Sequence, residues 1–383
     1  MTIQSASTPL VLSGLDGTNP LGFLAALGTL VTLHEGVNVK PRLGWKRSLT
    51  WTPILECPGI HNPEALSNTL ADALRGISVS SDAEARREAT LLEFDLAKKA
   101  VKDKRNEIKR RKLRGSDWKT AFDIEVAPLE EKLRQKRQSW LMALKEAVPR
   151  PELAIGKHID CTVDEYRDQA NNFIALSNHT HRETIDLLAA FGSDACIDER
   201  LRHITGTPFC FITGSGHQYF LDTVRQLMEV VNRERIYATL FEPWTYGDEK
   251  LSMRWDPLED RRYALMDRDP TTSDNKSRTV WMANLLAYRA LVLFPSASRG
   301  KHLNTTAWNH LGDIHAFTWP FWEQPADLDS IRSILQLPEL TAANPDTSIL
   351  RARGIVAAFR ARRIQVGNPP LHKINFSTAG GIL

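Results

Sequence analysis

Two groups of residues have a spacing that could support site chemistry, and the first is the histidine pair His179 and His181. On one face of a strand, two imidazoles this close could ligate a metal ion, and Glu183 and Asp186 follow them. Two histidines are a weak ligand set by themselves, and the two acids fit helix capping and solvent exposure equally well. We therefore expect no metal here, and a metal-dependent nucleic-acid-processing enzyme stays open as an alternative.

The second group is a short glycine loop, Gly214–Gly216. It lies between an expected buried strand over 208–213 and an expected helix with His217 and Gln218 in its first turn. Backbone N–H groups that glycines free at the start of a helix form an anion site, and short polar side chains can read base edges. The sequence thus places Ser215, His217 and Gln218 where they could reach a phosphate or a base edge, which makes them the candidates for motif reading. An ordinary turn that needs glycine only for its backbone angles is the alternative.

Other chemical signatures are absent from the sequence, which contains no HExxH, GxSxG, Walker A or EF-hand motif. We therefore expect a protein that is not an enzyme and uses no cofactor. No apolar run approaches the ~20 residues of a membrane span, and no basic region precedes an apolar stretch at the N-terminus. Four widely spaced cysteines make a disulfide framework or a zinc ribbon unexpected, which favours a cytoplasmic protein: Cys57, Cys161, Cys196 and Cys210.

The net charge of +3 is distributed unevenly along the chain. Residues 81–150 hold 19 Lys/Arg against 13 Asp/Glu, residues 151–346 hold 19 against 28, and residues 347–383 hold 6 against none. Two basic regions separated by an acidic body favour a polyanionic partner, although each patch alone could be a solvated surface. The residues that we expect to contact phosphates are Lys46, Arg47, Lys109, Arg110, Arg111, Arg351, Arg360 and Arg362.

Residues 82–147 have the composition of long helices, because a dense Glu/Lys/Arg/Ala/Leu pattern contains one glycine, Gly115, and one proline, Pro128. We expect an antiparallel helical hairpin with arms of roughly 30 residues, each about 45 Å long, and a second arm capped by Ser116 or Asp117. From Lys98 to Lys119 there are 11 Lys/Arg against 3 acids. This basic tip has few apolar positions, so we expect it to need a partner for order.

Ten tryptophans are present, and Trp45, Trp118 and Trp255 lie beside basic residues. Aromatic and cationic side chains together suit stacking on unpaired bases. Most of the ten tryptophans are nevertheless expected to be structural.

The rest of the chain predicts a helix-rich α+β fold. Asn19 and Asn62, each followed by proline, are expected to cap helices, which makes Asn19 a weaker candidate for motif reading than the glycine loop. Residues 43–56 read as a β-hairpin, and residues 250–256 and 261–267 as paired strands. Residues 354–366 read as a strand, with Arg360, Arg362 and Arg351 expected on one basic face. We expect an N-terminal α+β segment, a charged hairpin insertion, a continuation of the core domain and a C-terminal α+β region, over residues 1–81, 82–147, 148–249 and 250–383.

Several segments, taken in order, resemble the large subunits of type I-G (formerly I-U) CRISPR effector complexes. They are LSGLDGTNPLGFLAALGTLVTL, GSGHQYFLDTVRQL, MRWDPLEDRRYALMD, FTWPFW and RARGIVAAFRARRI. The resemblance runs from near residue 9 to near residue 366, and residues 82–147 are its least similar part. It includes no fixed motif-reading signature, so no residue role is carried over from the family.

The resemblance implies a non-catalytic subunit of an RNA-guided antiviral ribonucleoprotein. Such subunits lie beside backbone subunits that bear the CRISPR RNA, and they check the protospacer-adjacent motif of double-stranded target DNA. They also help to open the duplex and to recruit the helicase–nuclease effector. A purely structural subunit, whose charges bind only neighbouring subunits, stays open as a further alternative.

Overall fold

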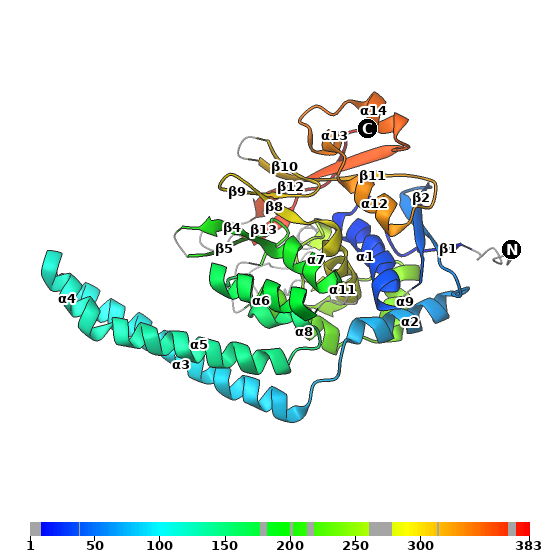
Figure 1. Ribbon diagram of the computed structural model, residues 1–383. Helices are drawn as coiled ribbons and strands as arrows, with labels where there is room; N and C mark the ends of the chain where they lie inside the picture. The colour runs from blue at the N-terminus through cyan, green and yellow to red at the C-terminus, as the bar shows by residue number, and fades with distance from the viewer. Residues whose placement is uncertain are drawn as a thin grey trace, which may run out of the picture. The chain divides into compact units, whose positions relative to one another are not determined.

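The computed structural model describes residues 9–37, 39–176, 182–199, 202–212, 218–259, 278–311, 314–366 and 373–383. These residues form a helix-rich α+β structure, as the sequence predicts (Figure 1). Two compact units are present: residues 77–156 form one, and residues 1–76 with 157–383 form the other. None of the helices in the described ranges combines the length and the apolarity needed to cross a membrane.

A buried helix, α1 (Pro20–Gly36), lies at the centre of the larger unit. Its sequence is apolar on all sides, and every residue from Pro20 to Leu33 is buried. Asn19 caps it as predicted, because its Oδ1 accepts from the backbone N–H of Leu21 at 2.9 Å. Helix α11 (Trp281–Arg289), which continues into the 3-10 helix η3 (Ala290–Leu293), packs along it. These helices pack so closely that a Cβ added at Gly28 would lie 1.6 Å from the carbonyl oxygen of Leu286.

Two antiparallel sheets pack against this helix pair through aromatic rings. The first has the strand order β1-β3-β2. The second runs β10-β11-β12-β13, and β14 also pairs with β12. Phe23 of α1 stacks on Trp45 of β2 and contacts Trp319 of β11, with ring centroids 5.4 and 6.0 Å apart. The strands are β1 (Leu10–Val11), β2 (Arg42–Arg47), β3 (Trp51–Glu56), β10 (Trp308–Leu311), β11 (Ile314–Phe321), β12 (Ala357–Val366), β13 (Lys373–Phe376) and β14 (Gly380–Gly381).

The other elements of the larger unit are short helices and two-stranded sheets. Each small sheet is antiparallel and pairs β4 with β5, β6 with β7 or β8 with β9. The helices are α2 (Pro63–Arg75), α6 (Val163–Leu176), α7 (Arg182–Phe191), α8 (Phe220–Glu229), α9 (Arg233–Phe241), α12 (Leu328–Leu335), α13 (Pro338–Thr341) and α14 (Thr347–Ala352). The strands are β4 (Gly192–Asp198), β5 (His203–Gly206), β6 (Asp248–Glu249), β7 (Arg278–Thr279), β8 (Ser296–Arg299) and β9 (His302–Thr305).

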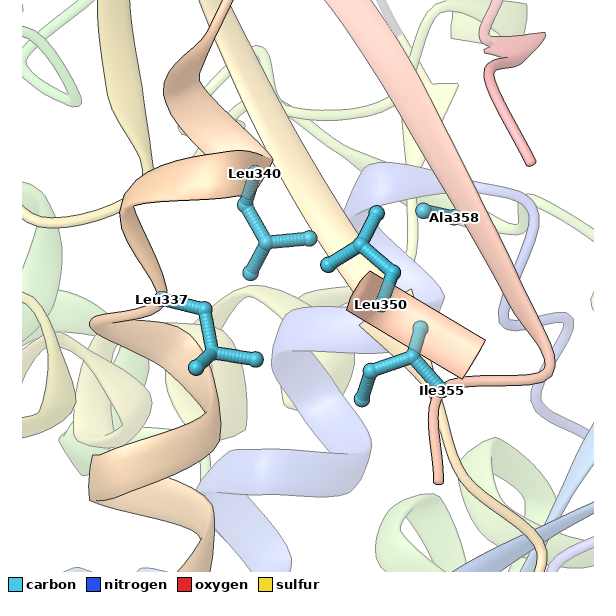
Figure 2. Packing of buried hydrophobic residues seen from close by; sticks show 5 residues of the cluster. All are labelled: Leu337, Leu340, Leu350, Ile355 and Ala358. Atoms are coloured by element: carbon cyan, nitrogen blue, oxygen red, sulfur yellow. The ribbon is translucent and has the colours of Figure 1, made fainter. Parts of the chain in front are cut away.

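An apolar cluster holds the short C-terminal helices in place. Figure 2 shows Leu340 of α13 and the preceding Leu337 facing Leu350 of α14, Ile355, and Ala358 of β12. Burial of these side chains fixes α13 and α14 against one face of the larger sheet.

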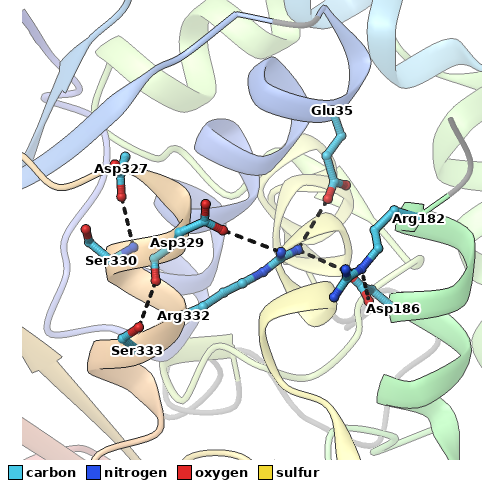
Figure 3. A network of polar contacts seen from close by, with 8 residues as sticks. All are labelled: Glu35, Arg182, Asp186, Asp327, Asp329, Ser330, Arg332 and Ser333. Atoms are coloured by element: carbon cyan, nitrogen blue, oxygen red, sulfur yellow. Dashed lines mark hydrogen bonds and ion pairs between the residues drawn. The ribbon is translucent and has the colours of Figure 1, made fainter. Parts of the chain in front are cut away.

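A polar crosslink joins α12 to two other helices. In Figure 3 the guanidinium of Arg332 on α12 reaches Asp186 of α7 at 2.9 Å and Glu35 of α1 at 3.5 Å. Three helices far apart in the sequence are thus tied through one side chain.

One stretch of irregular chain passes through the core and is fixed by hydrogen bonds. The carboxylate of Asp256 accepts from Asn19 Nδ2 at 2.9 Å and from the Tyr246 hydroxyl at 2.7 Å. Trp255 Nε1 donates to the carbonyl of Phe209 at 2.8 Å, and Met253 N donates to the side chain of Asn284 at 2.8 Å. Buried polar groups need such partners because an unpaired one loses its hydration without compensation.

These bonds explain two corrections to the predicted strands. Residues 208–212 and 251–256 are irregular instead of extended in a sheet, because their backbone serves this network. The expected strand partner at 261–267 lies outside the described residues, and β6 pairs with β7.

Glu259 is buried at the end of the same stretch. Its carboxyl accepts from the Ser252 hydroxyl at 2.5 Å and from the Thr279 hydroxyl. Burial, reinforced by the nearby carboxylate of Asp256, raises the pKa of Glu259 to about 8. The group is therefore a neutral acid at pH 7 in the folded protein.

We predict that Gly28→Ala lowers the free energy of unfolding by about 3 kcal/mol, the upper end for overpacking, since backbone of α11 stands where the methyl group would go. Urea denaturation followed by circular dichroism measures this difference. Gly36→Ala in the last turn of α1 is the matched control, because its Cβ would meet the side chain of Ala73 at 3.1 Å and no backbone. Equal stability of the two variants would contradict the packing argument.

We also predict that part of the pH dependence of stability comes from Glu259. Its folded pKa lies above the unfolded value near 4.5, so the folded state binds more protons between the two values. Stability is then lost as pH rises from about 4.5 to about 8. Urea denaturation at pH 5, 6.5 and 8 should show this loss, and Glu259→Gln should flatten it. The same slope in both proteins would show that Glu259 is ionised in the fold.

Candidate nucleic-acid interface

The unit over residues 77–156 is an antiparallel helical hairpin made of α3 (Ser81–Arg110), α4 (Gly115–Glu125) and α5 (Ala127–Glu146), followed by the 3-10 helix η1 (Pro151–Ile155). Ion pairs connect the arms, and they join Arg86 to Glu146 (2.9 Å), Glu93 to Lys136 (2.6 Å) and Arg105 to Glu130 (2.5 Å). Because residue numbers rise along α3 while their partners fall along α5, the arms are antiparallel. Figure 1 shows the arms lying side by side with α4 at the distal end.

The second arm differs from the prediction in two ways. It is broken at Val126, because Pro128 in the first turn of α5 has no N–H to continue the helix of α4. Neither Ser116 nor Asp117 is the N-cap, since α4 begins at Gly115 and the cap residue, Arg114, makes no side-chain capping bond. By contrast, α3 is capped by Ser80, whose Oγ accepts from Ala83 N at 3.2 Å.

A thin apolar seam runs between the helices of the hairpin. Phe94 of α3 stacks on Trp140 of α5, with ring centroids 5.5 Å apart. Nearer the distal end, Val101, Ile108 and Val126 are buried together, and side chains of α4 and α5 cover them. The distal end therefore has an apolar cluster of its own, which the sparse apolar pattern did not predict.

Three of the 11 basic residues from Lys98 to Lys119 are used inside the hairpin. Arg105 pairs with Glu130 on α5, Lys104 bonds Glu107 at 2.8 Å, and Arg111 bonds Glu125 at 2.6 Å as well as Glu107. Hydrogen bonds from Lys104 and Arg111 hold the pKa of Glu107 below its usual value. Arg111, predicted to contact phosphate, thus closes the hairpin turn.

The other eight are exposed to solvent and make no ion pair among the described residues. We call them the free cations of the tip, and they are Lys98, Lys99, Lys102, Lys109, Arg110, Lys112, Arg114 and Lys119. The acids nearest in sequence are either paired, as Glu107 and Glu125 are, or face solvent, as Asp103 and Asp117 do.

Helix geometry places five of the free cations on one side of α3. Successive residues of an α-helix are rotated by about 100°, so Lys98, Lys102 and Lys109 lie within about 40° of one another. Lys99 and Arg110 adjoin them on the side away from the buried seam. The result is a continuous basic strip, which a polyanion can neutralise along its length.

Trp118 in the first turn of α4 lies among these cations and is 46% exposed. Its ring stacks on Phe122 one turn later, with centroids 5.1 Å apart and planes 24° apart. The guanidinium carbon of Arg105, on α3, lies 6.0 Å from the centre of the Phe122 ring. The distal end thus presents an exposed indole and free cations together.

The expected glycine-loop site is only partly described. Ser215 and His217 lie outside the described residues, and Gln218 is exposed just before α8. The helix begins at Phe220, so Gln218 does not stand in its first turn as predicted. Its first N–H groups are already used, because Phe220 N donates to His158 Nδ1 at 3.3 Å and the next two residues donate to the carbonyl of Lys157. These three N–H groups are therefore not available to an anion, and the N–H groups of the glycine loop lie outside the described residues.

Asn19, the other motif-reading candidate, is buried, and both ends of its amide are engaged by Leu21 N and Asp256. It is therefore part of the fold and cannot reach a base. Lys46 and Arg47 are exposed at the end of β2, next to the hairpin turn, as predicted.

The C-terminal arginines do not form one basic strand face. Arg360 is part-buried, and its guanidinium donates to Thr318 Oγ1 at 2.9 Å and to the carbonyls of Leu340 (3.0 Å) and Ala342 (2.7 Å). It stabilises the end of α13 and is not available to phosphate. Arg351 lies on α14 instead of a strand, and it is exposed, as is Arg362 on β12.

Within the described ranges, no group of three or more His, Cys, Asp or Glu residues is arranged to hold a metal ion. His179 and His181 lie outside these ranges. The four cysteines are free thiols, and burial raises the pKa of Cys57 to about 11 and that of Cys210 to about 12. Because the thiolate is the nucleophile, these two sulfurs are unreactive near neutral pH. No protein-family model and no curated protein sequence matches this chain.

We predict that Arg360→Met lowers the free energy of unfolding by about 2 kcal/mol, because charge-assisted hydrogen bonds to Thr318 and to carbonyls near α13 are lost. Arg362→Met, two residues along the same strand and exposed, should change stability by less than about 0.5 kcal/mol. Thermal and urea denaturation measure both effects. Loss of DNA affinity in Arg360→Met without loss of stability would contradict this structural role.

Proposed function

We propose that this protein is the non-catalytic large subunit of an RNA-guided CRISPR surveillance complex. In this role it binds double-stranded target DNA, checks the protospacer-adjacent motif and helps to recruit the helicase–nuclease effector, beside backbone subunits that bear the CRISPR RNA in the cytoplasm. The ordered segments that resemble this family support the proposal. The observation that carries DNA binding is the basic strip of free cations on α3.

Nucleic-acid backbone is the partner that best fits this strip. A duplex presents a regular line of negative charge, and each Lys or Arg that meets a phosphate releases a condensed counterion. The free cations have no acids of their own to displace, so contact with phosphate costs the hairpin none of its internal ion pairs. Such contacts are independent of sequence and position the protein on the duplex.

Reading of a motif requires other residues, because phosphate contacts carry no sequence information. Gln218 is the described candidate that has both a donor and an acceptor exposed. Further phosphate contacts are available from four exposed residues, which are Lys46 and Arg47 at the end of β2, Arg351 on α14 and Arg362 on β12. The role of the glycine loop stays a prediction.

The test reverses the charge of three free cations whose side chains make no ion pair among the described residues: Lys109→Glu, Arg110→Glu and Lys112→Glu. We expect the triple variant to lose at least about tenfold in affinity for DNA duplexes of unrelated sequence, with a smaller salt dependence, because phosphate contacts and counterion release are lost. Fluorescence anisotropy with labelled duplexes over a series of salt concentrations measures both quantities. Arg111 is left unchanged because it closes the hairpin turn.

A control variant with the same change in charge separates this strip from net charge. Lys40→Glu, Lys145→Glu and Arg202→Glu replace exposed cations outside the tip. We expect the control to bind duplexes within about twofold of the unchanged protein at physiological salt, since distant exposed charges are screened. Equal losses in both triple variants, or an unchanged salt slope in the tip variant, would contradict a DNA-binding hairpin.

A further inference from the structure

We propose that Trp118 stacks on an unpaired nucleobase, so that the tip of the hairpin binds single-stranded nucleic acid in preference to duplex. This inference rests on the proposed function, because it uses the free cations to hold the strand. It adds the form of nucleic acid that the tip prefers, because the positive charge of the free cations suits single strands and duplexes alike.

The indole of Trp118 is built as a stacking platform. Phe122 stacks on one face of the indole, with ring centroids 5.1 Å apart. The indole makes no second ring contact among the described residues, and almost half of its surface is exposed. A flat base can therefore stack on the face of the indole that Phe122 leaves open.

A second tryptophan of the same hairpin shows what a structural role looks like. Trp140 also stacks on a phenylalanine, Phe94, but it is 3% exposed and lies in the seam between the arms. Trp118 is not among the buried residues of the seam, and the residues of α4 before it are Gly115, Ser116 and Asp117. Packing within the hairpin explains Trp140 and leaves the exposed face of Trp118 without a role.

The surroundings of Trp118 select a nucleic-acid strand as the occupant. Lys119 follows Trp118, and Arg114 and Lys112 precede it in the turn; all three are exposed and have no ion pair in the part of the chain that the structure describes. Asp117 is the acid of this turn, and its carboxylate accepts from the hydroxyl of Ser116 at 3.4 Å. Cations beside an exposed aromatic ring are the combination by which proteins bind single strands with little sequence preference.

Duplex DNA offers no base face on which the Trp118 indole could stack. Its bases are stacked on one another, so their faces are hidden and only their edges and the phosphates are accessible. The free cations can bind either form through phosphates. Trp118 gains a contact only when a base is unpaired, and the preference for single strands should therefore reside in this one side chain.

The experiment compares Trp118→Ala and Trp118→Phe in the full chain with four probes of equal length. These are a labelled DNA single strand, an RNA of the same sequence, the DNA duplex and a DNA strand with abasic sites. We expect Trp118→Ala to lose about tenfold or more in affinity for the intact DNA strand and to keep its affinity for duplex. Trp118→Phe should retain most of the binding. An equal loss on RNA would show that either single strand is accepted.

The abasic strand isolates stacking from charge, because it keeps the phosphates and lacks bases. The unchanged protein should bind it as weakly as Trp118→Ala binds the intact strand, and Trp118→Ala should bind both strands alike. Ile124→Ala, which removes another exposed apolar side chain from α4, should have no effect on any probe. A uniform loss on all four probes, or none, would overturn stacking by Trp118.

The outcomes separate this inference from the proposed function. If Trp118→Ala binds every probe normally while the Lys109, Arg110 and Lys112 reversal weakens binding, the stacking inference fails and the DNA-binding surface remains. If the unchanged protein binds no probe even at low salt, the charge-based surface fails as well. In that case the exposed indole is better explained as a contact for an acidic protein.

Discussion

The close approach of α1 to α11 is the constraint on which the larger unit depends. It requires a residue without a side chain at Gly28, and it buries α1 along nearly its full length. Because α1 is buried on all sides, it contacts every neighbouring layer of the larger unit directly. Phe23 packs on aromatic rings of both large sheets. Glu35 in the last turn pairs with Arg332, and Asn19 at the N-terminus donates to Asp256. A change in the distance between α1 and α11 would therefore displace the contacts of α1 with both sheets, with α12 and with the irregular chain near Asp256.

The hairpin is held together by different forces. Its arms are joined by the Phe94–Trp140 stack, by the buried cluster of Val101, Ile108 and Val126, and by exposed ion pairs such as Arg105 with Glu130. Exposed ion pairs contribute little each and weaken with salt, so the apolar contacts carry more of the association at high ionic strength. Several acids of the hairpin are engaged in these internal pairs, and the side of α3 away from the seam keeps its unpaired cations.

Local signals in the sequence were enough to predict the local structure. Asn19 and Asn62 cap helices as predicted, because each of these capping bonds spans three residues or fewer. Features that depend on distant partners could not be predicted in this way. Arg360 is committed to carbonyls about 20 residues away, and 208–212 is irregular because its backbone serves Trp255. The basic residue next to Trp118 suggested a stacking role from the sequence. The structure was needed to show that Trp118 is exposed, whereas Trp140 is buried between the arms.

The ladder of ion pairs between α3 and α5 has a consequence for how the hairpin can change over time. Each rung joins two positions whose residue numbers rise on one arm as they fall on the other, from Arg86 with Glu146 to Arg105 with Glu130. An insertion in one arm alone would shift all residues beyond it relative to the other arm, and the ion pairs on that side of the insertion would no longer face one another. Whole helical turns added to both arms at once would keep the rungs matched. The reach of the basic tip is thus free to vary among descendants of this gene in paired steps, while the body that begins again at Lys157 keeps its own packing.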